Sequence, residues 1–330
     1  MLTSISKIRE KIFQDTSFDF NEVALELFYY QYTYNSVYRQ FSDLLKVAHN
    51  KVGKLEDIPF LPIECFKTHK VIVDHLNTEK IFESSGTTGE TNSKHYVADI
   101  SLYEQSFKNA FHRFYGETED WIILALLPSY LERGNSSLIF MTDHLIKLSG
   151  VHSGFYLNNL DELSKTLKNL QLENKKILLI GVTYALLDFA EQFPMDLNHV
   201  TIMETGGMKG RRKEITRDEV HAILKEKFNV NTIHSEYGMT ELLSQAYSDG
   251  NGIFRTPPWM KAMKRDLYDP RSVSVSPGRG GLNVIDFANM YSCPFIATQD
   301  LVHLKTADTF EIPGRIDFAA IRGCNLMLSN

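Results

Sequence analysis

Cysteine, long apolar runs and excess positive charge are all scarce in this chain of 330 residues. Its three cysteines, Cys65, Cys293 and Cys324, are far apart and odd in number, so neither a disulfide framework nor a paired-cysteine metal site is available. No stretch approaches about 18 uninterrupted apolar residues, and the N-terminus is amphipathic and charged, which argues against a membrane span and a secretion signal. We therefore expect a protein of the reducing cytoplasm.

The charge balance and several missing motifs argue against further classes of protein. The formal net charge is -6, whereas binding to nucleic acid or to an anionic membrane needs a positive field. The eleven histidines form no HExxH pattern, which argues against a zinc site. The patterns GxxxxGK[ST], GxGxxG and GxSxG are absent too, so a Walker loop, a Rossmann fingerprint and a serine-hydrolase elbow are not indicated.

The pattern along the chain predicts an α/β fold. With 43% hydrophobic and 23% charged residues, a chain of this length can bury about 75% of its unfolded surface. Apolar β-branched runs alternate with amphipathic stretches, which predicts a mixed, largely parallel sheet flanked by helices. The expected strands are 70–74, 80–84, 121–128, 175–182 and 199–207, and the expected helices are 100–115, 137–149 and 160–173. Beyond about residue 253, runs joined by Gly and Pro predict a β-rich subdomain.

The first fifty residues have a helical pattern that is crowded with aromatic side chains. These are Phe28, Tyr29, Tyr30, Tyr32, Tyr34 and Tyr38. The cluster is typical of a core under a helical cap, and an acyl pocket is the alternative.

A loop of small hydroxylated residues follows the expected strand 80–84. The stretch "KIFESSGTTGE" brings Ser, Thr and Gly together directly after an apolar run. Glycine allows a ligand to approach the backbone closely, and hydroxyls and amides can surround phosphate oxygens. The loop is therefore either a phosphate-binding loop or a solvated turn, because the same residues favour turns.

Five stretches in order resemble the motifs of the adenylate-forming enzymes, the superfamily of acyl-CoA synthetases, luciferases and peptide-synthetase adenylation domains. They are "SSGTTG" at 84–89, "METGGMKG" at 203–210, "SEYGMTEL" at 235–242, "TQDLVHL" at 298–304 and "PGRIDFAAIRG" at 313–323. Two more stretches, "IPFLPIECFK" at 58–67 and "IRGCNLML" at 321–328, are similar to the LuxE-type acyl-protein synthetases, which supply acyl groups to a fatty-acid reductase.

The resemblance implies a binding site for ATP. The loop residues Ser84, Ser85, Gly86, Thr87, Thr88 and Gly89 would hold the β- and γ-phosphates. Gly206 and Gly207 would let the main chain approach the nucleobase, and Tyr237, followed by Gly238, would stack on adenine. Asp300 would accept hydrogen bonds from both ribose hydroxyls, and Arg315 would reach the nucleotide. Plain turns are the alternative for the glycines and for Asp300.

The same resemblance implies the catalytic groups. Thr240 would touch the α-phosphate and Glu241 would bind Mg²⁺, for which a hard oxygen ligand is suitable. A helix start with an exposed Glu is the alternative. Superfamily members usually have Pro-Lys directly after the loop, whereas Lys94 lies two residues later, so it is either a catalytic cation or a solvated surface lysine.

Larger relatives carry a further C-terminal domain with a catalytic lysine. Thirteen residues follow Asp317 here, which is too few to fold, so Lys94, Lys209, Arg322 or a partner protein would supply the cation. Cys324 matches the thiol that receives the acyl group in acyl-protein synthetases, and Arg322 could lower the pKa of that thiol. A small inert core cysteine is the alternative.

The resemblance therefore implies an ATP- and Mg²⁺-dependent ligase that activates a carboxylic acid, expected to be a fatty acid, and passes it to a thiol. We expect a helical N-terminal region at 1–55, an adenylate-forming domain at 56–312 and a hinge-like remnant at 313–330. The final acceptor would be a partner reductase through Cys324, or coenzyme A or an acyl-carrier protein if Cys324 is inert. From another class, the chain could be a non-catalytic nucleotide-binding subunit of a reductase complex.

Overall fold

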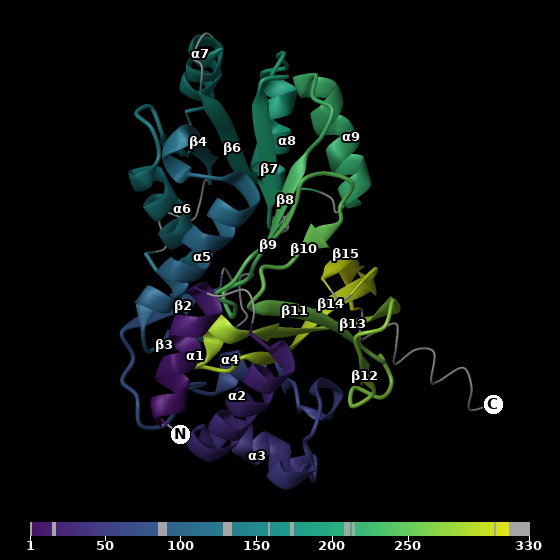
Figure 1. Cartoon of the computed structure of the whole chain (residues 1–330). Coiled ribbons are helices and arrows are strands. Elements are labelled where there is room, and N and C mark those ends of the chain that lie inside the picture. Colours follow the sequence, from purple (N-terminus) through teal and green to yellow (C-terminus); the bar gives the residue numbers. More distant parts are fainter. Residues whose placement is uncertain are drawn as a thin grey trace, which may run out of the picture.

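The structure is a computed structural model with helices and strands arranged around one large sheet (Figure 1). It describes residues 2–14, 18–84, 91–127, 134–157, 159–171, 175–207, 212, 215–306 and 308–316. The α/β class expected from the sequence is confirmed. None of the helices in these ranges is both long enough and apolar enough to cross a membrane.

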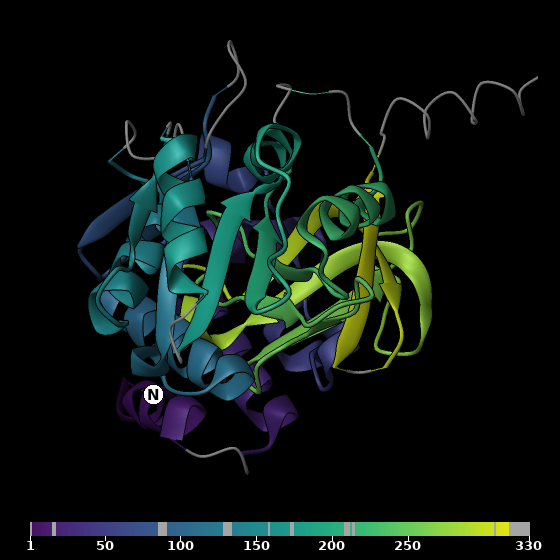
Figure 2. The same cartoon turned by 90° about the horizontal axis from the view of Figure 1, so that it is seen from above.

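The main sheet has 13 strands among the described residues. In spatial order they are β12 (Val273–Ser274), β11 (Met260–Arg265), β13 (Gly278–Asp286), β14 (Phe295–Leu304), β15 (Thr309–Arg315), β10 (Phe254–Arg255), β9 (Ala246–Ser248), β8 (His234–Tyr237), β7 (Val200–Thr205), β6 (Lys176–Val182), β4 (Trp121–Leu126) and β5 (Gly154–Tyr156), while β1 (Leu61–Pro62) pairs with β14. The strands from β5 to β8 are parallel, and from β8 to β12 each neighbouring pair is antiparallel. Figure 2 shows the sheet passing from the teal strands to the yellow strands.

The parallel half follows the expected alternation of strands and helices. Its helices are α5 (Ile100–Tyr115), α6 (Ser137–Leu148), α7 (Leu160–Leu170), α8 (Thr183–Gln192) and α9 (Arg217–Phe228). Every residue of β4 is buried, as is typical of a parallel strand covered on both faces. The N-terminus of α9 has a capping box, in which Thr216 and Glu219 satisfy each other's backbone amides.

The strand expected at 70–74 is wrong. Val71 and Val73 are buried as their apolar character suggests, but the segment is irregular. The amide of Val73 donates to the carbonyl of Tyr291 at 2.9 Å, and that of Asp74 donates to the carbonyl of Tyr34 at 2.7 Å. The segment is therefore buried and hydrogen-bonded to two separate parts of the chain, and its β-branched run does not indicate a strand.

A separate hairpin precedes the parallel half. Its strands β2 (Lys80–Glu83) and β3 (Lys94–Val97) pair in antiparallel register, with Glu83 opposite Lys94. The expected strand at 80–84 is thus confirmed, and the hydroxyl-rich loop of the sequence connects the two strands of this hairpin.

Three helices form the N-terminal part and cover the lower end of the molecule in Figure 1. They are α1 (Leu2–Gln14), α2 (Phe20–Tyr34) and α3 (Ser36–Leu44). Phe28, Tyr30 and Tyr38 are almost fully buried, and the hydroxyl of Tyr38 donates to the carbonyl of Pro59 at 2.6 Å. The core interpretation of the aromatic cluster is therefore confirmed for these three side chains.

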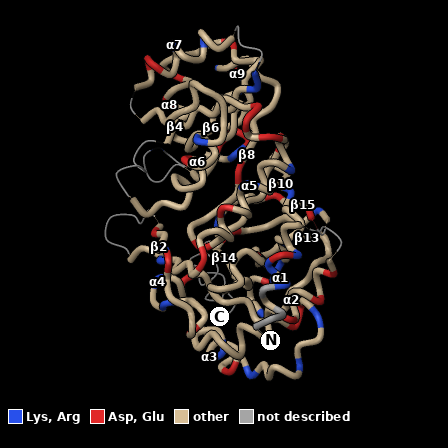
Figure 3. The backbone as a smooth tube through the Cα atoms, turned by 60° about the vertical axis from the view of Figure 1, so that its left-hand side comes forward, with Lys and Arg blue, Asp and Glu red and all other residues tan. Residues whose placement is uncertain are grey.

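Acidic and basic residues are interspersed along the chain in both halves of the molecule (Figure 3). The ion pairs with the highest side-chain exposure, such as Arg271 with Asp269 at 3.8 Å, contribute little because solvent screens them. The fold consequently depends on its apolar core and on a few buried polar contacts.

Asn35, between α2 and α3, is one of these buried contacts. Its side-chain oxygen accepts from the amide of Tyr38, and its side-chain nitrogen donates to Gln31 and to the carbonyl of Ser292, both at 2.8 Å. Gln31 in turn donates to the carbonyl of Met290 at 2.8 Å. The N-terminal helices are thereby joined to the turn between β13 and β14.

Replacing Asn35 by Ala should cost about 2 to 4 kcal/mol of the free energy of unfolding, because a helix cap is lost and a buried carbonyl loses its donor. Asp19→Ala removes an exposed cap at α2 and should cost about 1 kcal/mol or less. Urea unfolding of both variants measures the difference. Equal losses would show that Asn35 acts as a cap alone.

Candidate active site

The hairpin approaches the "SEYGMTEL" segment through buried polar contacts. Ser84 closes the base of the hairpin loop: its amide donates to the carbonyl of Ser93 at 3.0 Å, and its hydroxyl accepts from the amide of Ser93 at 2.9 Å. The side chain of Ser93 hydrogen-bonds the carboxylate of Glu241. Of the loop residues expected to hold phosphates, Ser85, Gly86, Thr87, Thr88 and Gly89 lie outside the described residues.

His95 makes the second contact between the hairpin and this segment, and the sequence analysis missed it. Its Nδ1 lies 2.8 Å from the carbonyl of Thr240, and its Nε2 lies 2.8 Å from the hydroxyl of Ser292. Burial lowers the pKa of His95 to about 4, so the ring is neutral near pH 7. A neutral ring must donate from Nδ1 to the carbonyl and accept at Nε2 from the hydroxyl.

Glu241 is buried beside the base of the hairpin, not exposed at a helix start. Burial raises the pKa of its carboxyl, while the Ser93 hydrogen bond and the charges of Lys67 and Arg315 oppose the rise. Lys67, on α4 (Cys65–Thr68), is a neighbouring cation that the sequence analysis did not identify. Lys67 is the last residue of the "IPFLPIECFK" stretch, which is similar to the LuxE-type synthetases. The resemblance assigned no role to the individual residues of this stretch.

The structure does not place Lys94 beside the carboxylate of Glu241. It lies on the exposed face of the hairpin, and its Nζ is 3.6 Å from Oε1 of Glu83 directly opposite. Because neighbouring side chains of a strand point to opposite faces, the inward position belongs to His95. The surface-lysine alternative is therefore the one that the geometry favours.

Tyr237 and Asp300 meet where the two halves of the sheet adjoin. The hydroxyl of Tyr237, at the end of β8, donates to Oδ2 of Asp300 on β14 at 2.7 Å. Arg315, at the end of β15, places Nε 3.8 Å from Oδ1 of Asp300. Burial raises the pKa of Asp300, and the Tyr237 hydrogen bond and Arg315 oppose this rise. An oxygen that accepts from Tyr237 retains a second lone pair for a ligand.

The expected glycines lie at the ends of β7 and β8. Gly206 has a positive φ of 71°, which a turn at the end of β7 requires, and a side chain at Gly207 would meet open space. A Cβ at Gly238 would lie 2.4 Å from Oε1 of Glu236, so a larger residue there would require the Glu236 carboxylate to move. Met208 and Lys209 lie outside the described residues.

Two buried carboxylates lie at the carboxyl ends of β7 and β8, where open α/β sheets bind ligands. Glu236 accepts a hydrogen bond from the hydroxyl of Thr205, and burial raises its pKa to about 7. Glu204 pairs with Arg217 at 3.0 Å, and although burial raises the pKa of Glu204, His221 and Arg217 lower it overall. Glu204 lies in the "METGGMKG" stretch and Glu236 in the "SEYGMTEL" stretch, but the resemblance assigned a role to neither carboxylate.

A buried arginine lies behind Asp300 on the antiparallel side. Arg265 donates to the carbonyls of Leu282 at 2.6 Å and Thr298 at 2.5 Å, and to Oδ1 of Asn283 at 2.9 Å. A Cβ at Gly281 would lie 2.8 Å from its guanidinium carbon, so the "GRGG" glycines make room for it. Burial lowers the pKa of Arg265.

A chain of contacts links this side to the nucleotide motifs. Gln299 donates to Glu64 at 2.5 Å and accepts from Arg315 at 2.7 Å. The substitution of "TGD" by "TQD" therefore adds a side chain that holds Arg315. Asp317, Arg322 and Cys324 lie outside the described residues, and no cluster of three or more metal-ligating side chains occurs within the described ranges.

Comparison with solved structures defines the fold as that of the adenylate-forming enzymes. A 2-hydroxyisobutyryl-CoA ligase in complex with 2-HIB-AMP and CoA matches with a TM-score of 0.67 and 12% identity over 90% of this chain and 69% of that chain. A long-chain-fatty-acid-CoA ligase from Archaeoglobus fulgidus matches with a TM-score of 0.51 and 14% identity, covering 73% and 52%. An acyl acid amido synthetase in complex with 2,4-DB gives 0.50 and 10%, covering 96% and 71%.

Within that fold, residues 9–106 match the family model described as "Acyl-protein synthetase, LuxE". A search of curated proteins found no match. The resemblance drawn from the sequence, to LuxE-type synthetases and to the adenylate-forming superfamily, is confirmed by these findings.

Replacing Glu236 by Gln should remove a pH dependence of stability. The folded-state pKa of about 7 lies above the usual glutamate pKa of 4.5, so the contribution of the protonated acid is present below pH 4.5 and is lost as the pH rises through 7. The variant should match the wild type near pH 4.5 and exceed it by roughly 3 kcal/mol at pH 8. Denaturant unfolding at both pH values measures this.

The exposed Glu226 on α9 provides the matched control, because its side chain is 77% exposed. Glu226→Gln should leave the pH profile unchanged. If the Glu236→Gln profile also runs parallel to that of the wild type, the assigned protonation is wrong.

Proposed function

We propose that this protein activates a carboxylic acid with ATP and transfers the acyl group to a thiol. The carboxylate attacks the α-phosphorus of ATP, the bond to the bridging oxygen breaks, and pyrophosphate leaves. The attacking thiolate then displaces AMP from the acyl-adenylate to form a thioester. The observation that carries the proposal is the convergence of Ser84, Glu241, Tyr237, Asp300 and Arg315 on one junction of the fold.

Asp300 would bind the ribose. A carboxylate is an acceptor only, so it can pair with two hydroxyl donors, and the Tyr237 hydroxyl fixes its orientation at 2.7 Å. Arg315 would bind a phosphate or the ribose, since its guanidinium is 73% exposed and already held by Gln299. Gly206, Gly207 and the ring of Tyr237 would accept the base.

Glu241 fits a magnesium ion by its chemistry. Mg²⁺ in nucleotide sites is bound by one or two carboxylates together with waters and substrate phosphates, and Glu241 supplies one such carboxylate beside the hairpin. When bound, the ion would neutralise charge on the leaving pyrophosphate. Thr240 would contact the α-phosphate, with its backbone held by His95. Residues 85–89 would surround the β- and γ-phosphates.

The proposed acceptor of the acyl group is Cys324, from which a partner reductase would take it. The two described cysteines are poor thiolates: burial raises the pKa of both Cys65 and Cys293, and a thiol with a raised pKa is weakly nucleophilic at neutral pH. Arg322, two residues before Cys324, would have the opposite effect on that thiol. A fatty acid is the proposed substrate, in keeping with the LuxE family match at residues 9–106.

Acid-dependent release of pyrophosphate tests the adenylation step. Asp300→Asn retains the acceptor for Tyr237 but replaces one ribose acceptor by a donor, so KM for ATP should rise about 10- to 100-fold. Asp308→Asn is the matched control, with a side chain that is 75% exposed, and should leave KM unchanged. An unaltered KM in Asp300→Asn would remove Asp300 from the nucleotide site.

Labelling with a radioactive acid and ATP tests the transfer step. The protein should acquire a label that hydroxylamine removes, and Cys324→Ser should abolish the label while Cys65→Ser retains it. Label that survives Cys324→Ser would refute acylation at that residue. Pyrophosphate release without any label would favour coenzyme A or an acyl-carrier protein as acceptor. No pyrophosphate with any aliphatic or aromatic acid, the partner being present, would favour a non-catalytic nucleotide-binding subunit.

A further inference from the structure

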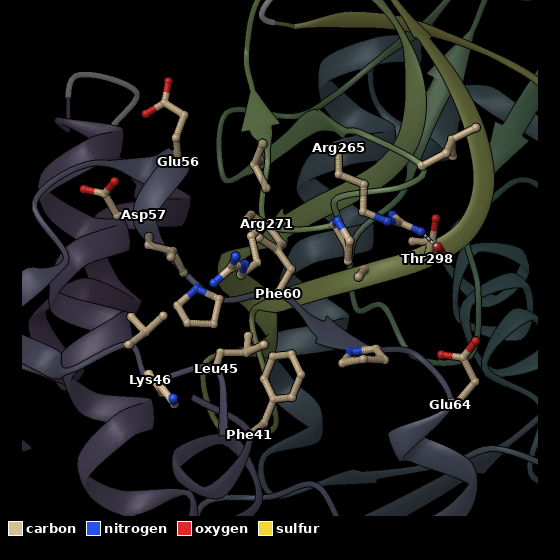
Figure 4. Close-up of a pocket in the computed structure, with 18 of the residues that line it drawn as sticks. Phe41, Leu45, Lys46, Glu56, Asp57, Phe60, Glu64, Arg265, Arg271 and Thr298 are labelled. Carbon is tan, nitrogen blue, oxygen red and sulfur yellow. Dashed lines mark hydrogen bonds between the residues drawn. The ribbon is translucent and has the colours of Figure 1, made fainter. Parts of the chain in front are cut away.

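A cavity of about 590 Å³ lies between the N-terminal helices and the antiparallel half of the sheet (Figure 4). Its wall comes from the end of α3, the segment 56–64, the turn between β11 and β12, and β14. A volume of about 300 to 1,000 Å³ is typical of a site for a small organic ligand. The aromatic cluster at 28–38, for which an acyl pocket was the alternative, contributes no residue to this lining.

The wall of this cavity is mainly apolar and its rim is charged. Phe41, Leu45, Ile58, Phe60 and Val273 are among its apolar lining. The exposed lining residues include Lys46, Lys51 and Arg271, which lie at the solvent side. An apolar wall of this extent favours a ligand with a long aliphatic part, because each methylene removed from water strengthens binding by about fourfold.

The inner end of the cavity adjoins the proposed nucleotide site. Thr298 and Ile316 line the cavity, and each is close in sequence to a nucleotide residue: Asp300 lies two positions after Thr298 on β14, and Arg315 directly precedes Ile316. Glu64, also in the lining, is bonded to Gln299, which holds Arg315. A ligand that fills the cavity would therefore have its inner end beside the nucleotide.

Arg265 is a buried arginine at this inner end. In Figure 4 its guanidinium lies beside Thr298, on the side opposite Phe41 and Leu45. Its three bonds to Leu282, Asn283 and Thr298 all go to uncharged oxygens, and the carboxylates of Glu64 and Asp300 oppose the lowering of its pKa by burial. The inner end of the cavity therefore carries charges of both signs, whereas the wall is apolar. This polar end suits the carboxyl end of an acid that lies beside the nucleotide, and the apolar wall suits its tail.

We propose that this cavity binds the aliphatic chain of the carboxylic acid, with the carboxyl group directed toward Thr298 and the nucleotide. The inference rests on the proposed function for the identity of the acid. It assigns chain-length selection to the N-terminal helices and the β11–β12 turn, which contribute the wall. It also places the acyl chain beside Ile316, which lies eight residues before Cys324 in the sequence.

The test measures binding of fatty acids without nucleotide, through displacement of the fluorescent fatty acid cis-parinaric acid. In the wild type, affinity should rise about fifteenfold from octanoate to decanoate and again to dodecanoate, because each step buries two more methylenes at about fourfold each. Val273→Trp fills the cavity and should weaken dodecanoate at least tenfold. Val275→Trp is the matched control, since Val275 lies two residues away and does not line the cavity, and it should bind as the wild type does.

A second pair of variants guards against a misfolded Val273→Trp protein. Leu45→Asp places a charge in the wall, whereas Leu44→Asp changes the neighbouring side chain, which is 82% exposed. Only Leu45→Asp should weaken dodecanoate at least tenfold, with both variants folded by circular dichroism. Unchanged affinity in folded Leu45→Asp and Val273→Trp, or a wild type that does not bind dodecanoate, would overturn the inference.

The pyrophosphate assay separates this inference from the proposed function. If dodecanoate binds as described but no acid releases pyrophosphate, the cavity is a fatty-acid site and the adenylation proposal fails. If acids release pyrophosphate but Val273→Trp and Leu45→Asp keep the chain-length profile of the wild type, adenylation stands and the cavity assignment is overturned.

Discussion

A neutral, fully buried imidazole holds the parts of this site together. His95 bridges the carbonyl of Thr240 and the hydroxyl of Ser292, and the carbonyl of Ser292 accepts from Asn35 between the first helices. These hydrogen bonds connect the N-terminal helices, through the turn before β14, to the "YGMTE" segment. Because the ring has one donor and one acceptor when neutral, it fits both partners only in one tautomer, which fixes the hairpin relative to the rest of the site.

The change from parallel to antiparallel pairing explains why the site lies where it does. In the parallel half, β7 ends directly before Gly206 and β8 ends at Tyr237, and the antiparallel half contributes Asp300 and Arg315 from β14 and β15. These elements are far apart in the chain, yet the sheet order brings them to one junction. Each half thus supplies a different part of the proposed nucleotide site, while the hairpin supplies Ser84 and the contact to Glu241.

The sequence predicted the features that depend on local pattern. The alternation of strands and helices and the adenylate-forming motifs could be recognised in the sequence, because each of these signals is contained in a short stretch of residues. The prediction of a strand at 70–74 was wrong because a buried irregular segment has the same apolar pattern in the sequence as a buried strand. His95, Glu236 and Arg265 were missed because their partners are distant in sequence: His95 and Thr240 are 145 residues apart. A single buried polar residue has no periodic signature.

The outer strands of the main sheet are unusually short for a sheet of this width. The two ends of its strand order are β5, with three residues, and β12, with two. Unpaired backbone groups at a sheet border can recruit a strand from another molecule, and short borders offer few of them. Within the part of the chain that the structure describes, the main sheet therefore presents little template for β-addition by another molecule.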